Sequence, residues 1–213
     1  MLAARIPMTR GGFDAWLAAP LPGLGIVENP SAMYTGWAVD GAAADWELTE
    51  IAGHPEAVAG IRADRGRTPL ERLAARAARG FTLVRHRADA LEVYLYDYHA
   101  DGYGTQTDLL MLAGAGRFAA PGAGAAVMHW GGNVDPGLPL RGDDPLAVLL
   151  VGNARAARAR FTDRHPLAAL VEELRPVETD FLAASVDHGD ESYGWDAADV
   201  LDPTVRARIP TDS

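Results

Sequence analysis

The chain has 213 residues, a formal charge of −10 and no cysteine. A length of this order suits one large domain or two small ones, and we expect a single compact unit over residues 1–213. The lack of cysteine excludes disulfides, thiolate nucleophiles, Cys-type zinc sites and iron–sulfur clusters. All 19 basic residues are arginine, which is typical of a GC-rich bacterial genome and excludes P-loop lysines and Schiff-base chemistry.

The apolar content of 48% and the charged content of 23% are those of an ordinary globular protein. No apolar run approaches the roughly 20 residues that cross a bilayer, and the first 20 residues lack the apolar centre of a signal peptide. We therefore expect a cytoplasmic protein that does not enter a membrane.

The N-terminal part, residues 1–80, is predicted to be mainly helical. Residues 9–20 form one candidate helix, with Phe13, Trp16 and Leu17 on one side. The strongest helix signal covers residues 68–80. There Thr68 and Glu71 have the spacing of a capping box, Gly80 stands where a C-terminal glycine belongs, and the expected buried stripe is Leu70, Leu73 and Ala77.

From residue 81 the apolar pattern changes to a period of two, which predicts strands. We expect an antiparallel β meander over about residues 81–130, within a sheet region that extends over residues 81–151. A helical, acidic C-terminal part follows over residues 153–213, with an amphipathic helix that buries Leu167, Leu170, Val171 and Leu174. A sheet packed against flanking helices predicts the α+β class.

Residues 91–112, LEVYLYDYHADGYGTQTDLLML, predict a β-hairpin that turns at Asp101 and Gly102. Both plausible registers place Asp97, His99 and Asp108 on one face of this hairpin, together with Gln106. Carboxylates and imidazoles are ligands for divalent metals. Asp97, His99 and Asp108 are therefore candidate metal ligands, to which Asp101 or His129 could be added.

Other interpretations of this face remain open. Polar residues near a hairpin tip can simply reach into water, and Asp before Gly is a common turn pair. The same residues could form a structural hydrogen-bonded cluster, or act as acids and bases without a metal. The opposite face would carry Tyr94, Tyr96 and Tyr98, which we expect a helix to cover; uncovered, they would form a recognition surface.

Charge is unevenly distributed along the chain. Residues 172–203 contain ten acidic residues and the single Arg175, whereas residues 62–90 contain eight arginines and three acidic residues. Arg72, Arg76 and Arg79 would align as a stripe on one helix. These charges could form solvated faces, or the acidic region could fold back on the arginines.

The leading functional hypothesis is an acidic protein-binding module without a cofactor. It would dock on a basic partner protein, as an immunity protein docks on a toxin or a nucleic-acid mimic on a nuclease. A surface this negative disfavours free nucleic acid as a ligand. The candidate partner-binding residues combine acids with two aromatics, namely Asp187, Asp190, Glu191, Tyr193, Trp195, Asp196 and Asp199.

The alternative hypothesis is a small metal-dependent enzyme whose divalent metal lies at the tip of the 91–112 hairpin. The metal would polarise a substrate oxygen or activate water. No G-x-S-x-G elbow and no G-x-G-x-x-G loop is present to indicate a hydrolase triad or a dinucleotide site.

Overall fold

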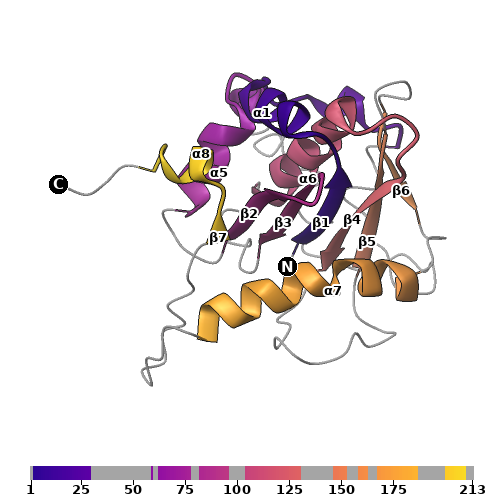
Figure 1. Ribbon diagram of the computed structural model, residues 1–213. Helices are drawn as coiled ribbons and strands as arrows, with labels where there is room; N and C mark the ends of the chain where they lie inside the picture. Colours follow the sequence, from indigo (N-terminus) through magenta and orange to yellow (C-terminus); the bar gives the residue numbers. More distant parts are fainter. Residues whose placement is uncertain are drawn as a thin grey trace.

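The computed structural model describes residues 2–29, 59, 62–77, 82–95, 104–130, 146–152, 158–162, 167–186 and 200–209. A seven-stranded mixed sheet with the order β6-β5-β4-β1-β3-β2-β7 runs through this part of the chain (Figure 1). Its neighbours are antiparallel except β2 and β7, which are parallel. The strands are β1 (Leu2–Pro7), β2 (Thr82–Arg87), β3 (Ala90–Leu95), β4 (Ala125–Trp130), β5 (Leu146–Val151), β6 (Arg160–Thr162) and β7 (Val200–Leu201).

Helices cover both faces of the sheet, which confirms the predicted α+β class (Figure 1). One face carries α1 (Arg10–Ala18), α5 (Pro69–Ala77), α6 (Gly104–Ala115) and the short 3-10 helices η1 (Leu24–Ile26) and η2 (Gly116–Phe118). The other face is covered by α7 (Leu167–Val186), while α8 (Pro203–Arg206) packs beside α5. Within the described residues, none of the helices combines the length and the apolar character needed to cross a bilayer.

Side-chain alternation along the strands divides the core into two layers. Leu91, Val93 and Leu95 of β3 are buried on the face that carries α1, α5 and α6. Tyr94 points to the opposite face, where its ring lies 4.6 Å from the ring of Phe181 on α7. The prediction that a helix covers the tyrosine face is confirmed for Tyr94; Tyr96 and Tyr98 lie outside the described residues.

Two N-terminal helices follow their sequence signals. In α1, Thr9 caps the first turn by accepting a hydrogen bond from Gly12 N, and the apolar side is buried. In α5, Thr68 N donates to Glu71 Oε2 at 2.9 Å and Glu71 N donates to Thr68 Oγ1 at 3.2 Å, which is the predicted capping box. Gly80, the predicted end of this helix, lies outside the described residues.

The predicted 91–112 hairpin is wrong, because residues 104–115 form helix α6 rather than a strand. Leu109 to Ala113 are at most 1% exposed. A helix that is buried on all sides has no polar face, so its sequence cannot be distinguished from a buried strand by periodicity. The predicted partner of β3 was the second strand of this hairpin; the strand that pairs with β3 there is instead β1.

The strands are also distributed more widely than expected. β1, β6 and β7 lie outside the predicted sheet region of residues 81–151. Because β1 is placed between β3 and β4, the order of strands is not that of a simple meander. Residues from both ends of the chain therefore contribute to one sheet.

Candidate functional site

Several acidic residues of the 172–203 segment are paired within the protein. Asp180 on α7 forms ion pairs with Arg85 and Arg87 on β2. Asp202, which caps α8, accepts hydrogen bonds from Arg10 at 2.7 and 3.1 Å. Intramolecular arginines thus neutralise these two acids, and for Asp180 the alternative that the acidic region folds back on the arginines of residues 62–90 is confirmed.

The pKa values of both aspartates lie below the ordinary value for Asp. For Asp180, the hydrogen bond from Arg85 is the main cause of the lowered pKa, and burial opposes it. For Asp202, burial is the largest influence and by itself would raise the pKa. Hydrogen bonds from Arg10 and from Thr204 N outweigh it, so the net pKa is lowered. Both carboxylates are therefore held in the charged form.

The candidate partner-binding residues all belong to the 187–199 segment, which lies outside the described residues. Their predicted role stays a prediction. Glu172 and Arg175, at the other end of the acidic segment, form an exposed pair one helical turn apart on α7, and exposed pairs of this kind contribute little to stability.

Asp108 does not lie on a hairpin face with Asp97 and His99. It belongs to the first half of α6, where its carboxylate is completely buried. Arg72 Nε donates a hydrogen bond to Asp108 Oδ1 at 2.6 Å, and Arg76 contacts Asp108 Oδ2 at 3.4 Å. A metal at Asp108 would have to displace these two guanidinium groups.

The other two predicted metal ligands, Asp97 and His99, lie outside the described residues, as does Asp101. Within the described part of the chain, no group of three or more His, Cys, Asp or Glu side chains is placed to hold a metal ion. The geometric basis of the metal hypothesis, a shared hairpin face, is absent because residue 108 is helical.

The predicted arginine stripe on α5 also has a different role. Arg72 and Arg76 have side chains that are only 13% exposed, and both point toward Asp108. They contribute to a buried ionic cluster and not to a solvated face. Arg79, the third member of the stripe, lies outside the described residues.

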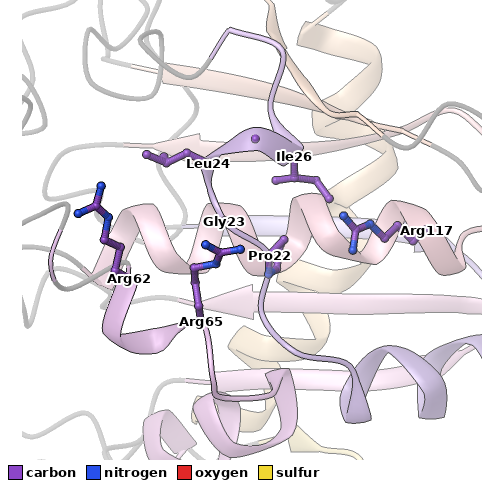
Figure 2. Close-up of a pocket in the computed structure, with 8 residues that line it drawn as sticks. Pro22, Gly23, Leu24, Ile26, Arg62, Arg65 and Arg117 are labelled. Atoms are coloured by element: carbon purple, nitrogen blue, oxygen red, sulfur yellow. The ribbon is translucent and has the colours of Figure 1, made fainter.

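A cavity of about 400 Å³, which the sequence did not indicate, lies on the side of the sheet that carries α6 (Figure 2). We call it the arginine pocket. Arg62 and Arg65 come from the segment before α5, Arg117 comes from η2, and the loop after α1 together with η1 supplies the remaining wall. The lining residues are Pro22, Gly23, Leu24, Gly25, Ile26, Arg62, Arg65 and Arg117.

Local contacts hold these three segments together. Pro22 packs against α6 at Gly114, where an added Cβ would lie 3.1 Å from the proline Cγ. Leu21 N donates to Arg67 O at 2.8 Å, which joins the loop after α1 to the segment before α5. The walls of the pocket are therefore attached both to each other and to the buried helix α6.

The three pocket arginines have no acidic partner among the described residues. Asp64, the acid nearest to Arg62 and Arg65 in sequence, instead contacts Arg67 at 3.5 Å and Arg72 at 3.1 Å. The guanidinium groups are spread along the pocket, with Leu24 and Ile26 opposite them (Figure 2). The result is a cavity with several cationic groups and an apolar wall.

This arrangement is suited to an oxyanion. A guanidinium group is planar and always charged, and its parallel N–H donors match two oxygens of a phosphate or carboxylate. The volume lies within the range of small-molecule pockets and exceeds what a single inorganic ion needs. The described lining residues combine three arginines with apolar side chains, and this set suits the binding of an anion.

The pocket lacked a local sequence signal because its cations come from distant positions. Arg62 and Arg65 were visible as part of the basic 62–90 segment. Arg117 is an isolated charge in GAGRFAAPGAG, and only the packing of α6 and η2 brings it to the same cavity. The clustered arginines of residues 62–67, RADRGR, were the one available indication.

Comparison with known proteins finds no matching family model, no matching curated protein and no matching solved structure.

Proposed function

We propose that this protein binds a small organic phosphate in the arginine pocket. The observation that carries the proposal is that Arg62, Arg65 and Arg117 line one cavity without an acidic partner among the described residues. Three cations that share a cavity repel one another, and an anion between them would relieve this repulsion.

The distribution of charge supports an anionic ligand despite the net charge of −10. The described residues contain 15 arginines and 12 acidic residues, so this part of the protein is slightly basic. The remaining residues carry four arginines and 17 acids. At the pocket itself, the described lining residues include three arginines and no acid, so an approaching anion meets a cationic wall.

The apolar wall defines the second property of the ligand. Leu24 is partly buried and Ile26 is 4% exposed, and both line the cavity opposite the arginines. A phosphate ester with an apolar body would place its phosphoryl oxygens on the guanidinium groups and its body on this wall. Because the arginines are exposed, we expect a modest dissociation constant of about 10⁻⁴ M.

Calorimetric titration tests the proposal. Phenyl phosphate should bind more tightly than inorganic phosphate, and neutral phenol should not bind measurably. Arg65→Gln and Arg117→Gln should each weaken binding several-fold, whereas Arg208→Gln, the same change at an exposed residue outside the pocket, should not. Equal effects of all three substitutions would show that only net charge matters, and would contradict a specific pocket.

We propose docking on a basic protein as a second candidate function, now confined to residues 187–199. This segment has five acids, Tyr193 and Trp195, and no arginine. The observation that favours it is this composition, because acidic residues interleaved with aromatic residues suit protein recognition. Asp180 and Asp202, which flank the segment in the sequence, pair with arginines of the described residues and are not part of the proposed surface. The five acids of residues 187–199 would thus be the part of the acidic region that contacts the partner.

A pull-down from native lysate at low and high salt tests this second candidate. Neutralising Asp190, Glu191 and Asp196 should abolish capture of a salt-sensitive partner. Neutralising the exposed Glu172 and Glu173 on α7 is the matched control and should leave capture unchanged. Capture that survives the first set of substitutions would contradict docking through this segment.

A further inference from the structure

We infer that Arg72 is a positioning residue for the arginine pocket, because it holds Asp64 away from the pocket arginines. The inference rests on the proposed binding of phosphate. Asp64 stands between Arg62 and Arg65 in the sequence, and it is the nearest carboxylate in the chain that could neutralise them. The side chain of Arg72 contacts this carboxylate from α5 instead.

The contact between Arg72 and Asp64 is sheltered. Arg72 NH1 lies 3.1 Å from Asp64 Oδ2, and the two side chains are 13% and 21% exposed. Among the described residues, Asp64 has one other ion pair, with Arg67. Arg67 NH1 lies 3.5 Å from Asp64 Oδ1, and the Arg67 side chain is 60% exposed. Arg72 is therefore the stronger of the two partners.

Arg72 is itself held by the interior of the protein. Its Nε donates to the completely buried Asp108 Oδ1 at 2.6 Å, so one guanidinium group joins Asp64 at the surface to α6 in the core. The planar guanidinium fork makes both contacts at once. The charge of Asp64 is thereby committed to the Asp108 cluster and not to the pocket.

Without Arg72, the carboxylate of Asp64 would lose this partner. The cations nearest to it in sequence are then Arg62, Arg65 and Arg67, and two of these line the pocket. An ion pair between Asp64 and either pocket arginine would remove one positive charge and would compete directly with a bound phosphate.

Arg76 provides a matched control for Arg72. Both arginines lie on α5, both side chains are 13% exposed, and both contact Asp108. The ion pairs of Asp64 in the described structure are with Arg67 and Arg72. Loss of either Arg72 or Arg76 removes the same charge from the same cluster, but loss of Arg72 also removes the more sheltered of the two ion pairs of Asp64.

The experiment measures phosphate affinity by calorimetry for the wild type, Arg72→Gln, Arg76→Gln and the double variant Arg72→Gln/Asp64→Asn. We expect Arg72→Gln to weaken binding about fivefold, which corresponds to one exposed ion pair, and Arg76→Gln to change it less than about twofold. The double variant should regain most of the lost affinity, because the competing carboxylate is absent.

A purely structural role for Arg72 predicts a different pattern. General loosening of the fold would weaken binding in Arg72→Gln, and the additional loss of Asp64 would not restore it. Equal affinities of Arg72→Gln and Arg76→Gln, or a double variant no better than Arg72→Gln, would overturn the inference while leaving the pocket in place. A wild type that does not bind phosphate would overturn the proposed function, and this inference with it.

Circular dichroism of each variant checks that it is folded. If Arg72→Gln does not fold, Arg72→Lys replaces it in the same comparison. Lysine keeps the charge at Asp108, but its single ammonium group cannot span two carboxylates as the guanidinium fork does. We expect Arg72→Lys to weaken phosphate binding as Arg72→Gln does, and the addition of Asp64→Asn to restore the affinity. Absence of the weakening or of the recovery would overturn the inference.

Discussion

Arg72 and Asp108 form an ion pair between α5 and α6 in which the carboxylate is completely buried and the Nε–Oδ1 distance is 2.6 Å. Replacing one partner of a buried pair leaves the other charge without compensation. We predict that Asp108→Asn lowers the free energy of unfolding by about 3 kcal/mol. Asp14→Asn, at an exposed pair on α1, should change it by less than about 0.5 kcal/mol. Urea unfolding measures the free energy of unfolding of both variants. If Asp108→Asn lost as little stability as Asp14→Asn, a structural role for Asp108 would be contradicted.

Acid should weaken the attachment of α8 to α1. The lowered pKa of Asp202 means that the folded protein binds fewer protons at this group than the unfolded chain does. Its contribution to stability is therefore complete above the ordinary pKa of 3.8 and is lost as pH falls through the lower folded value. The difference in unfolding free energy between the wild type and Asp202→Asn should shrink below about pH 4. A difference independent of pH between 2 and 6 would contradict this.

The turn between β2 and β3 offers a stabilising substitution. Ala88 and Asp89 have φ values of 47° and 51°, and Arg87 pairs directly with Ala90. A two-residue turn with both φ values positive favours Asn in its first position, whereas Ala is disfavoured there. Ala88→Asn should raise the free energy of unfolding by about 0.5–1 kcal/mol.

A change from Ala to Asn elsewhere controls for the residue type. Ala75 is exposed on α5, where Asn is the poorer helix former, so Ala75→Asn should lower the free energy of unfolding by about 0.6 kcal/mol. Thermal and urea unfolding give both values. Destabilisation by Ala88→Asn would mean that the turn does not have the described conformation.

Alanine substitutions at two glycines of the arginine pocket test whether the position of the Arg65 side chain determines phosphate affinity. An added Cβ at Gly23 would lie 3.1 Å from Arg65 Nε and 3.3 Å from its Cζ, whereas Gly25 has nothing within 4 Å of such an atom. Gly23→Ala should therefore displace the Arg65 guanidinium and weaken phosphate binding about threefold, on the order of one exposed charge contact. Gly25→Ala should leave binding unchanged.

Both glycine variants should fold. At Gly23 the added methyl group would contact only the end of the flexible Arg65 side chain, and the Gly23 φ of −90° is accessible to alanine; at Gly25 the methyl group would meet no atom within 4 Å. Unfolding curves check this. If the two substitutions had the same effect on phosphate affinity, the position of Arg65 would not matter for binding.

The elements with strong local signals could be predicted from the sequence. The capping box of Thr68 and Glu71 marks the start of α5, and alternating apolar residues mark β2 and β3. In each case the pattern is set within a few neighbouring residues. α1, with its Thr9 cap and the buried Phe13, belongs to the same group.

The failures arise where long-range packing decides the structure. α6 is enclosed on all sides, so its apolar run lacks the helical period, and the mistaken strand brought Asp108 to the wrong site. β1 was missed because its six residues are recognisable as a strand only from their pairing with β3 and β4. The arginine pocket combines three distant segments, and only the folded chain places Arg117 near Arg62 and Arg65.

A crystal structure of the protein with phenyl phosphate shows whether the arginine pocket binds a phosphate ester. We predict phosphoryl oxygens within hydrogen-bonding distance of Arg65 and Arg117, with the phenyl ring against Leu24 and Ile26. We also predict that Asp64 remains paired with Arg72 in the complex. A ligand bound elsewhere on the protein, with the arginine pocket empty, would show that this pocket is not the phosphate site.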